Sequence, residues 1–220
     1  MSEAMTVETI VEAYWRLQGY WTKLRFPFQT QGRGWSDIDV LAYHPEKKII
    51  VISESKVRGP KRAVYAYTNF SREKYGDIFK YDDSNYLGFL EQVKLICSDE
   101  VVFRKFSKMV DRITIQLVSN YYIDDSVMEK VKDDIYRKIK NSIPSGIEIE
   151  IRLDTTFHII CQIIKLEKSS LQGRRYGHPV IDIARELNRY LIPNVKYAGG
   201  RKEALKIKEK FRTMFEESLG

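Results

Sequence analysis

Hydrophobic residues recur with two different periods in the first quarter of the chain. At 6–19 they are spaced by three and four positions, as on one face of an amphipathic helix, and Gly19 suits its end. The stretches at 23–28, 36–43 and 48–56 instead have the composition and length of strands, and the last two are separated by a short polar turn. The last stretch contains four consecutive branched apolar residues, which indicates a strand buried on both faces. The pattern therefore predicts a helix, a strand and a β-hairpin.

Strands and helices continue to alternate over the rest of the chain. In 112–119 every second residue is apolar, and in 147–153 apolar and charged residues alternate, which is typical of a half-exposed edge strand. We expect helices at 87–96, at 101–110, at 124–141, from a cap at Asp154 or Thr155 to about Lys168, from Pro179 onward, and at 201–219. This order predicts an α/β fold, in which a mixed β-sheet is flanked by helices and followed by a helical C-terminal extension.

The predicted elements suggest two parts. We assign residues 1–153 to a core, with an insert at 57–86 that is rich in Tyr, Gly and charged residues. Residues 154–220 form the extension, which is helical, basic and expected to pack on the core. In the helix that begins at Pro179, the expected apolar face consists of Val180, Ile183, Ala184, Leu187 and Leu191.

The composition excludes several classes of protein. Of the 220 residues 43% are hydrophobic, enough for a sizeable core and against general disorder. No apolar run approaches the length of a membrane-spanning helix, and the first residues lack the pattern of a signal peptide. The two cysteines have neither zinc nor disulfide spacing, which favours a reducing, cytoplasmic location. The net charge of +7 favours an anionic partner.

Charged residues gather at the ends of the two hairpin strands. Asp37 and Asp39 share one face of the first strand, and Glu54 and Lys56 share one face of the second. A hairpin of suitable register brings Asp39, Glu54 and Lys56 to one edge of the sheet. Two neighbouring carboxylates favour a hard divalent cation such as Mg²⁺, which can activate a water and screen charge on a phosphodiester. A lysine beside them can orient that water or neutralise the transition state.

This arrangement resembles the PD-(D/E)xK nuclease superfamily, which has the restriction-endonuclease-like fold, and is similar to its Holliday junction resolvase and restriction endonuclease groups. The resemblance covers roughly residues 6–153. It implies that Asp39 and Glu54 bind the metal, Mg²⁺ or Mn²⁺. It also implies that the backbone carbonyl of Ser55 adds a ligand and that Lys56 is the catalytic lysine. The implied activity is endonucleolytic cleavage of DNA, including branched or single-stranded DNA, of restriction or repair type.

The resemblance also concerns the first helix. Many relatives place a Glu there, about eleven residues before the closing Gly. Glu8 stands at that distance before Gly19, and Glu12, one turn later, is its competitor. Ile38 stands where the family name has Pro, a position at which divergent members often differ.

Other interpretations of these residues stay open. Asp39, Glu54 and Lys56 can form a surface salt bridge without chemistry. A second acid-x-Lys triplet, Glu46-Lys47-Lys48, lies in the predicted turn, and we interpret it as solvated. The chain can also be a non-catalytic nucleic-acid-binding or scaffold module that reuses the nuclease fold, or an unrelated α/β protein with a chance match.

Basic residues flank the acidic cluster. Arg58, Lys61 and Arg62 follow it directly and are candidates for phosphate contacts. In the insert at 57–86, aromatic and basic residues are interleaved, which suits either unpaired nucleic acid or packing onto the core or a second subunit.

The end of the chain is also basic. Residues 173–220 contain eleven basic and six acidic side chains, which accounts for five of the seven net positive charges. Arg174 and Arg175 lie in a Gly-flanked turn and are further candidates for nucleic-acid contacts. A solvated helix face is the alternative. A homodimer would supply two active sites for two strands.

Three isolated residues are assigned to the core rather than to a site. His158 lies in an apolar helix, where a satisfied core histidine is the simpler interpretation than a catalytic base. Cys97 and Cys161 are expected to be small core residues.

Overall fold

The computed structural model describes residues 3–29, 34–56, 93–94, 109–119, 125–169 and 177–191, together with positions 206, 209, 210 and 213. The chain divides into two units, Met1–Ile159 and Ile160–Gly220. The expected insert at 57–86, the helix at 201–219 and nearly all of the helices at 87–96 and 101–110 lie outside the described residues.

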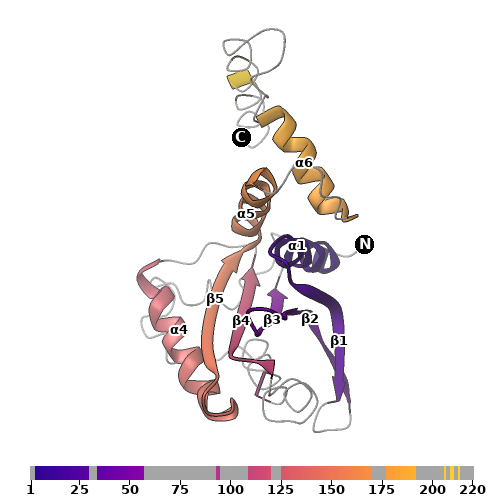
Figure 1. Ribbon diagram of the computed structural model, residues 1–220. Coiled ribbons are helices and arrows are strands. Elements are labelled where there is room, and N and C mark those ends of the chain that lie inside the picture. Colours follow the sequence, from indigo (N-terminus) through magenta and orange to yellow (C-terminus); the bar gives the residue numbers. More distant parts are fainter. Residues whose placement is uncertain are drawn as a thin grey trace. The chain divides into compact units, whose positions relative to one another are not determined.

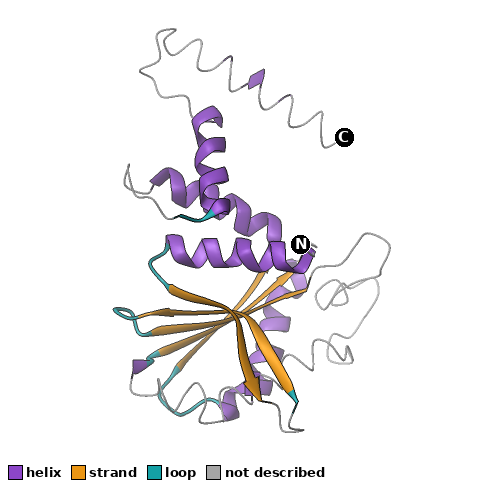
Figure 2. Ribbon diagram, turned by 90° about the vertical axis from the view of Figure 1, so that its right-hand side faces the viewer, coloured by secondary structure: helices purple, strands orange, loops and turns teal. Residues whose placement is uncertain are grey.

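The first unit is built on a five-stranded sheet (Figure 1). The strands follow the chain order β1 (Trp21–Gln29), β2 (Trp35–His44), β3 (Ile49–Lys56), β4 (Arg112–Ser119) and β5 (Glu148–Thr155). Neighbours are antiparallel from β1 to β3 and parallel from β3 to β5. The strands are splayed by the usual sheet twist (Figure 2). The predicted α/β class with a mixed sheet is confirmed.

Helix α1 (Glu3–Leu17) ends where the sequence predicts. The N–H of Tyr20 bonds to the carbonyl of Trp15, and the N–H of Gly19 to the carbonyl of Arg16. This pair of bonds is a Schellman motif, and Gly19 supplies the left-handed residue it needs, with φ of 88°. The motif turns the chain directly from α1 into β1.

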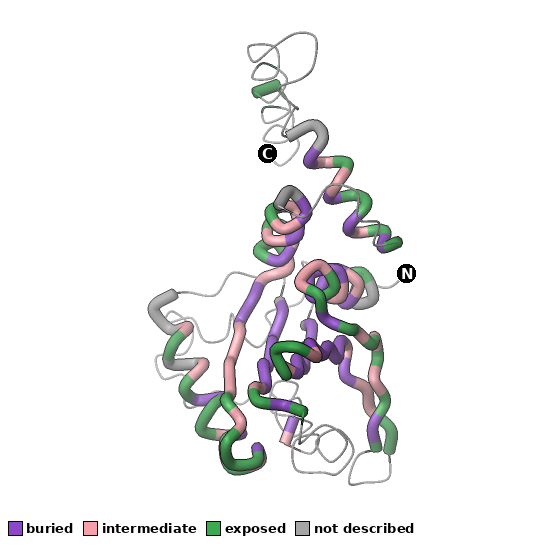
Figure 3. The backbone as a smooth tube through the Cα atoms, in the orientation of Figure 1, coloured by how far each residue is buried: buried purple, intermediate pink, exposed green. Residues whose placement is uncertain are grey.

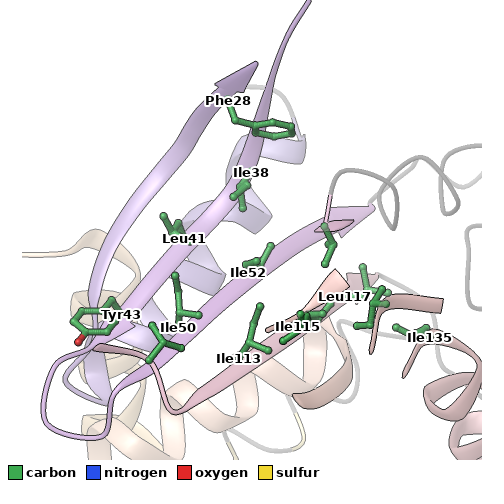
Figure 4. Close-up of a cluster of buried hydrophobic side chains, with 14 of the residues drawn as sticks. Phe28, Ile38, Leu41, Tyr43, Ile50, Ile52, Ile113, Ile115, Leu117 and Ile135 are labelled. Carbon is green, nitrogen blue, oxygen red and sulfur yellow. The ribbon is translucent and has the colours of Figure 1, made fainter. Parts of the chain in front are cut away.

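Helix α4 (Asp125–Ile139) and the short 3-10 helix η4 (Lys140–Ser142) precede β5. Ile135 and Ile139 of α4 belong to a buried cluster with alternate residues of β3 and β4 (Figure 4). The same strands are buried almost throughout, whereas β1 is largely exposed or half-buried (Figure 3). The core of the first unit therefore lies under α4, beneath the middle of the sheet.

The opposite face of the sheet holds α1. Gln116 of β4 lies between two cluster residues of that strand and points the other way, where its amide oxygen accepts a bond of 2.8 Å from Nε1 of Trp15. Its amide nitrogen donates to Oδ2 of Asp154 on β5, also at 2.8 Å. Both bonds are buried, so one side chain links α1 to the two parallel strands.

An arginine completes this buried polar group. Arg152 donates to the hydroxyl of Tyr14 at 2.9 Å, and its guanidinium lies 5.2 Å from the ring centroid of Trp15. Burial lowers the pKa of Arg152, but the charge of Asp154 and the interactions with Tyr14 outweigh burial and raise the pKa overall. The arginine therefore stays charged beneath α1 and holds the helix through both aromatic rings.

The outer hairpin changes faces at Arg25. Thr22 of β1 bonds to Glu12 of α1 at 2.9 Å, whereas Phe26 and Phe28 pack into the cluster under α4. Thr22, Phe26 and Phe28 are an even number of residues apart, so they would share one face of a regular strand. Arg25 lies between them with φ of 49°, the left-handed region, which explains the exchange.

The strand β2 shows the same exchange. Ile38 belongs to the cluster under α4, and so do Leu41 and Tyr43, at a spacing of three rather than two. Asp39 lies in this interval, opposite Arg25 in the register between β1 and β2. Both strands therefore reverse their faces at the same point.

Helix α5 (Thr156–Ser169) begins at the predicted cap and continues into the second unit. The hydroxyl of Thr155 accepts a bond of 3.0 Å from the N–H of His158, so Thr155 rather than Asp154 is the capping residue. The expected burial of His158 and Cys161 is wrong, because both are exposed. The buried positions described in α5 are instead Ile159, Ile163 and Glu167, each about one helical turn from the next.

Helix α6 (Pro179–Leu191) begins at the predicted proline, but its expected apolar face is wrong in part. Ile183 is 62% exposed, whereas Ile181, Ala184 and Asn188 are buried. The buried face is rotated because Asn188 donates to the carboxylate of Glu167 on α5 at 2.9 Å and to the carbonyl of Ile164. A polar contact that hydrophobic spacing cannot reveal thus fixes the orientation of α6.

Within the part of the chain that is described, none of the helices is long and apolar enough to cross a membrane.

Candidate active site

The side chain of Asp39 is bonded to the end of β3. Its Oδ2 atom accepts a hydrogen bond of 2.7 Å from the backbone N–H of Ser55 and another of 2.7 Å from the Ser55 hydroxyl. These bonds place the Asp39 carboxylate against the residue that follows Glu54. The convergence of the Asp39 and Glu54 side chains stays a prediction, because the bonds reach Ser55, and consecutive residues of a strand point to opposite faces.

Asp39 takes this position because the backbone pairing stops beside it. The ladder between β2 and β3 ends at the pair Val40 and Ser53, one step before Asp39 and Glu54 would be opposite each other. The Ser55 N–H, which no longer meets a backbone carbonyl of β2, is satisfied by the Asp39 side chain instead. One carboxylate oxygen is used for this bonding, which leaves Oδ1 as the oxygen available to a ligand.

Glu54 is a buried carboxylate, with 7% of the residue exposed. It lies beside Leu117 in the parallel register between β3 and β4, and two residues after Ile52 on the same side of the strand. This places it at the margin of the apolar cluster, where a charged group is costly unless a partner or an ion compensates it. Ser55, the expected carbonyl ligand, is also buried.

Lys56 is the last residue of β3, and its backbone is paired with Ser119 of β4. Its side chain lies outside the described residues. The same holds for the expected nucleic-acid-binding residues, which are Arg58, Lys61, Arg62, Arg174 and Arg175.

Glu8 is paired with a residue that the sequence analysis missed. Its two carboxylate oxygens accept hydrogen bonds from Nε and Nη2 of Arg25, at 3.0 and 2.9 Å. The side chain of Glu8 is 5% exposed, against 50% for Arg25. Glu12, the competitor of Glu8, accepts the bond from Thr22 described above. The first helix therefore presents Glu8, and not Glu12, toward the strand residue opposite Asp39.

Arg25 is surrounded by negative charge. Its pKa is raised by the hydrogen bonds to Glu8 and by the charge of Glu8, and more weakly by the charges of Asp37 and Asp39. The guanidinium is therefore a positive charge shared among three carboxylates at this edge of the sheet. The only signal in the sequence is a single arginine in an aromatic strand, which does not by itself indicate a partner 17 residues earlier in the chain.

The donor set agrees with a hard cation in its chemistry. Two carboxylates with waters and phosphate oxygens are a common environment for Mg²⁺, and Asp39 and Glu54 are the two carboxylates that the sequence predicts for it. No group of three or more His, Cys, Asp or Glu side chains that could hold a metal occurs among the described residues. A cation at this site would therefore depend on two side chains, the Ser55 carbonyl and non-protein ligands.

No protein family, curated protein or solved structure matches this chain.

Proposed function

We propose that the chain is a metal-dependent endonuclease that hydrolyses DNA phosphodiester bonds and has a restriction-endonuclease-like fold. The observation that carries the proposal is the pair of hydrogen bonds from Ser55 to Asp39. They fix one carboxylate at the end of β3, against the residue that follows the buried Glu54. An unrelated surface salt bridge accounts poorly for a carboxylate that is held in place by a backbone N–H.

The order of elements supports the fold. A helix, an antiparallel set of three strands and two further parallel strands follow one another as in the superfamily that the sequence resembles. Asp39 and Glu54 lie at the point where the ladder between β2 and β3 ends.

Each residue has a distinct role in the proposed reaction. Asp39 and Glu54 would hold Mg²⁺ or Mn²⁺ together with the Ser55 carbonyl, and Ser55 keeps the Asp39 carboxylate oriented. The cation would supply Lewis-acid activation of water and of the scissile phosphate. Lys56 orients the attacking water and stabilises negative charge on the phosphate.

Binding of DNA is proposed for the basic residues on both sides of the site. Arg58, Lys61 and Arg62 would contact phosphates next to the cut, and Arg174 and Arg175 phosphates further away. A homodimer would bring two such sites to a duplex, and branched or single-stranded DNA would need one site at a time.

A second candidate function is a non-catalytic nucleic-acid-binding or scaffold module. The Glu8–Arg25 pair favours it, because an arginine already neutralises the third acidic residue near the site. The lack of a group of three metal-ligating side chains within the described residues favours it as well.

Cleavage of supercoiled plasmid, single-stranded DNA and a four-way junction, each with and without Mg²⁺, tests the proposal. We expect wild type to cut at least one of these DNAs only with the metal, and Lys56→Ala to reduce the rate at least about 100-fold. Lys48→Ala is the matched control, because Lys48 ends the other acid-x-Lys triplet and forms only an exposed pair with Asp111. Equal rates for wild type and Lys56→Ala on all three DNAs would exclude the enzyme and leave the binding module.

A further inference from the structure

Two of the three tryptophans of the chain are exposed. Trp21 and Trp35 are 70% and 75% exposed, whereas Trp15 is buried against Gln116. Each exposed tryptophan is the first residue of its strand, Trp21 in β1 and Trp35 in β2. A large aromatic side chain in solvent is unfavourable, and such residues often mark a binding surface.

The two tryptophans lie at opposite ends of the outer hairpin. Trp35 pairs with Gln29, and Trp21 pairs with Tyr43 near the turn that leads to β3. Asp39 lies midway, four residues from Trp35 and four from Tyr43 along β2. The chain thus contains two tryptophans of similar exposure at similar distances along the strands from the acidic site, but in opposite directions.

Trp35 lies on the side of the site where the pairing of β2 with β3 has ended. Beyond Val40, toward Trp35, the described pairings of β2 are with β1 alone, because the ladder to β3 has ended. Residues 26–29 and 35–38 therefore continue as a two-stranded ribbon past the point where Ser55 bonds to Asp39. Trp21 lies toward the other end, where β2 and β3 are paired as far as His44 and Ile49.

The spacing from Trp35 to the acidic site suits a nucleic-acid strand. Four residues of extended strand span about 13 Å. A stacked nucleic-acid strand advances roughly 3.4 Å per nucleotide, so a base on Trp35 would be about four nucleotides from a phosphate at Asp39.

We propose that Trp35 is a stacking platform for an unpaired base of a nucleic-acid strand whose backbone passes the site at Asp39. The inference rests on the proposed function, because it takes that site as the place where the backbone is held. Stacking on a tryptophan needs a free base face, which single-stranded or unpaired regions offer and a continuous duplex does not. The preferred substrate is accordingly DNA with unpaired nucleotides on the ribbon side of the cut.

The experiment measures binding by the full chain without metal, so that cleavage does not interfere. Fluorescence anisotropy of a labelled oligothymidylate and of a duplex of the same length is compared for wild type, Trp35→Ala, Trp35→Phe and Trp21→Ala. We expect Trp35→Ala to weaken single-strand binding roughly 10- to 100-fold and duplex binding by less than about 3-fold. Trp35→Phe keeps an aromatic face and Trp21→Ala keeps the platform, so both should stay within about 3-fold of wild type.

Several outcomes would overturn the stacking role. These are no binding of the oligothymidylate by wild type, no loss for Trp35→Ala, equal losses for both alanine variants, or an equal loss on the duplex. Sedimentation of wild type as a dimer that Trp35→Ala converts to a monomer would show instead that Trp35 contacts a second copy of the chain. Because Trp35 is exposed, its substitution should leave the far-ultraviolet circular dichroism unchanged, and Trp35→Phe gives a second test if alanine perturbs the ribbon.

Failure of this inference is distinguishable from failure of the proposed function. Cleavage with Mg²⁺ together with unchanged binding by Trp35→Ala would remove the stacking role and leave the nuclease. Trp35-dependent binding without any cleavage would remove the nuclease and leave a binding module that recognises unpaired bases.

Discussion

Arg25 and Glu8 form a two-point ion pair between β1 and α1, in which both carboxylate oxygens of a nearly buried glutamate are bonded to one half-exposed guanidinium. The backbone of Arg25 is left-handed at the same place, which is unfavourable for a residue with a side chain. The local strain and the ion pair therefore occur together, and the pair helps to hold Arg25 in this conformation.

Removal of Arg25 alone should lower the thermal stability more than removal of Arg25 together with the negative charge of Glu8. Arg25→Ala leaves the Glu8 carboxylate buried without its cation, and we expect the thermal midpoint to fall by roughly 3–6 °C. Adding Glu8→Gln to Arg25→Ala should recover part of the loss, because the uncompensated charge disappears. Arg112→Ala, which breaks the exposed pair with Glu148, is the control and should change the midpoint by no more than about 2 °C. A double variant as unstable as Arg25→Ala would argue against this account.

Substitutions at the Asp39–Ser55 contact should separate effects on stability from effects on cleavage. Asp39→Asn keeps a side-chain oxygen that can accept from the Ser55 N–H, so we expect the free energy of unfolding to change by less than about 1 kcal/mol. Its charge is lost, and Mg²⁺-dependent cleavage should fall at least about 100-fold. Ser55→Ala removes only the hydroxyl bond and should retain cleavage within about 10-fold. Plasmid cleavage and urea denaturation, measured on the same preparations, check both parts.

Gln116 should be the most sensitive polar residue beneath α1. Gln116→Leu leaves the buried Trp15 N–H and Asp154 oxygen without this partner, and we expect a loss of about 2–4 kcal/mol in the free energy of unfolding. Thr114→Val on the same strand is the control, because its partner Glu150 is only half-buried and can be hydrated. The control should cost about 1 kcal/mol or less in urea denaturation. Similar losses for the two variants would mean that the buried amide has no special role.

Tyr20 should make the stability depend on pH in the alkaline range. Burial raises its pKa, and the charge of Glu150 raises it further. The folded chain then holds the phenol proton more tightly than the unfolded chain, in which Tyr ionises near pH 10. The contribution to stability is fully present below about pH 10 and is lost as the pH rises through the folded-state pKa.

The measurement compares unfolding curves of wild type and Tyr20→Phe between pH 8 and about pH 11. The difference between the two should shift in favour of Tyr20→Phe as the pH rises. Tyr136→Phe, at an exposed position on α4, should follow the wild-type profile. A Tyr20→Phe profile parallel to wild type at every pH would contradict the assignment.

Much of the fold could be predicted because it is encoded in local periodicity. Alternating isoleucines define β4 with the predicted bounds, and Gly19 and Pro179 mark helix ends through constraints on their own backbone. The hairpin pattern also predicted the pairing of β2 with β3, because two strands joined by a short turn leave few possible registers.

The misses have a common physical origin, namely contacts between residues far apart in the sequence. The Asn188–Glu167 bond rotates α6 relative to its hydrophobic stripe, and no spacing within α6 contains that information. The role of Arg25 could not be predicted for the same reason, since its partner Glu8 is on another element. Its left-handed backbone could not be predicted either, because the position is not a glycine. His158 was misassigned because an apolar helix still has an outward side.

The exchange of faces at Arg25 has a consequence for how the hairpin tolerates mutation. On β1, Thr22 before Arg25 contacts α1, whereas Phe26 and Phe28 after it pack into the cluster under α4. The exposed positions keep one phase along the whole strand, so a scan of polar substitutions should be tolerated at every second residue from Trp21 to Gln29. The positions between them should be limited by α1 in the first half of the strand and by the cluster in the second, with Asp39 at the boundary.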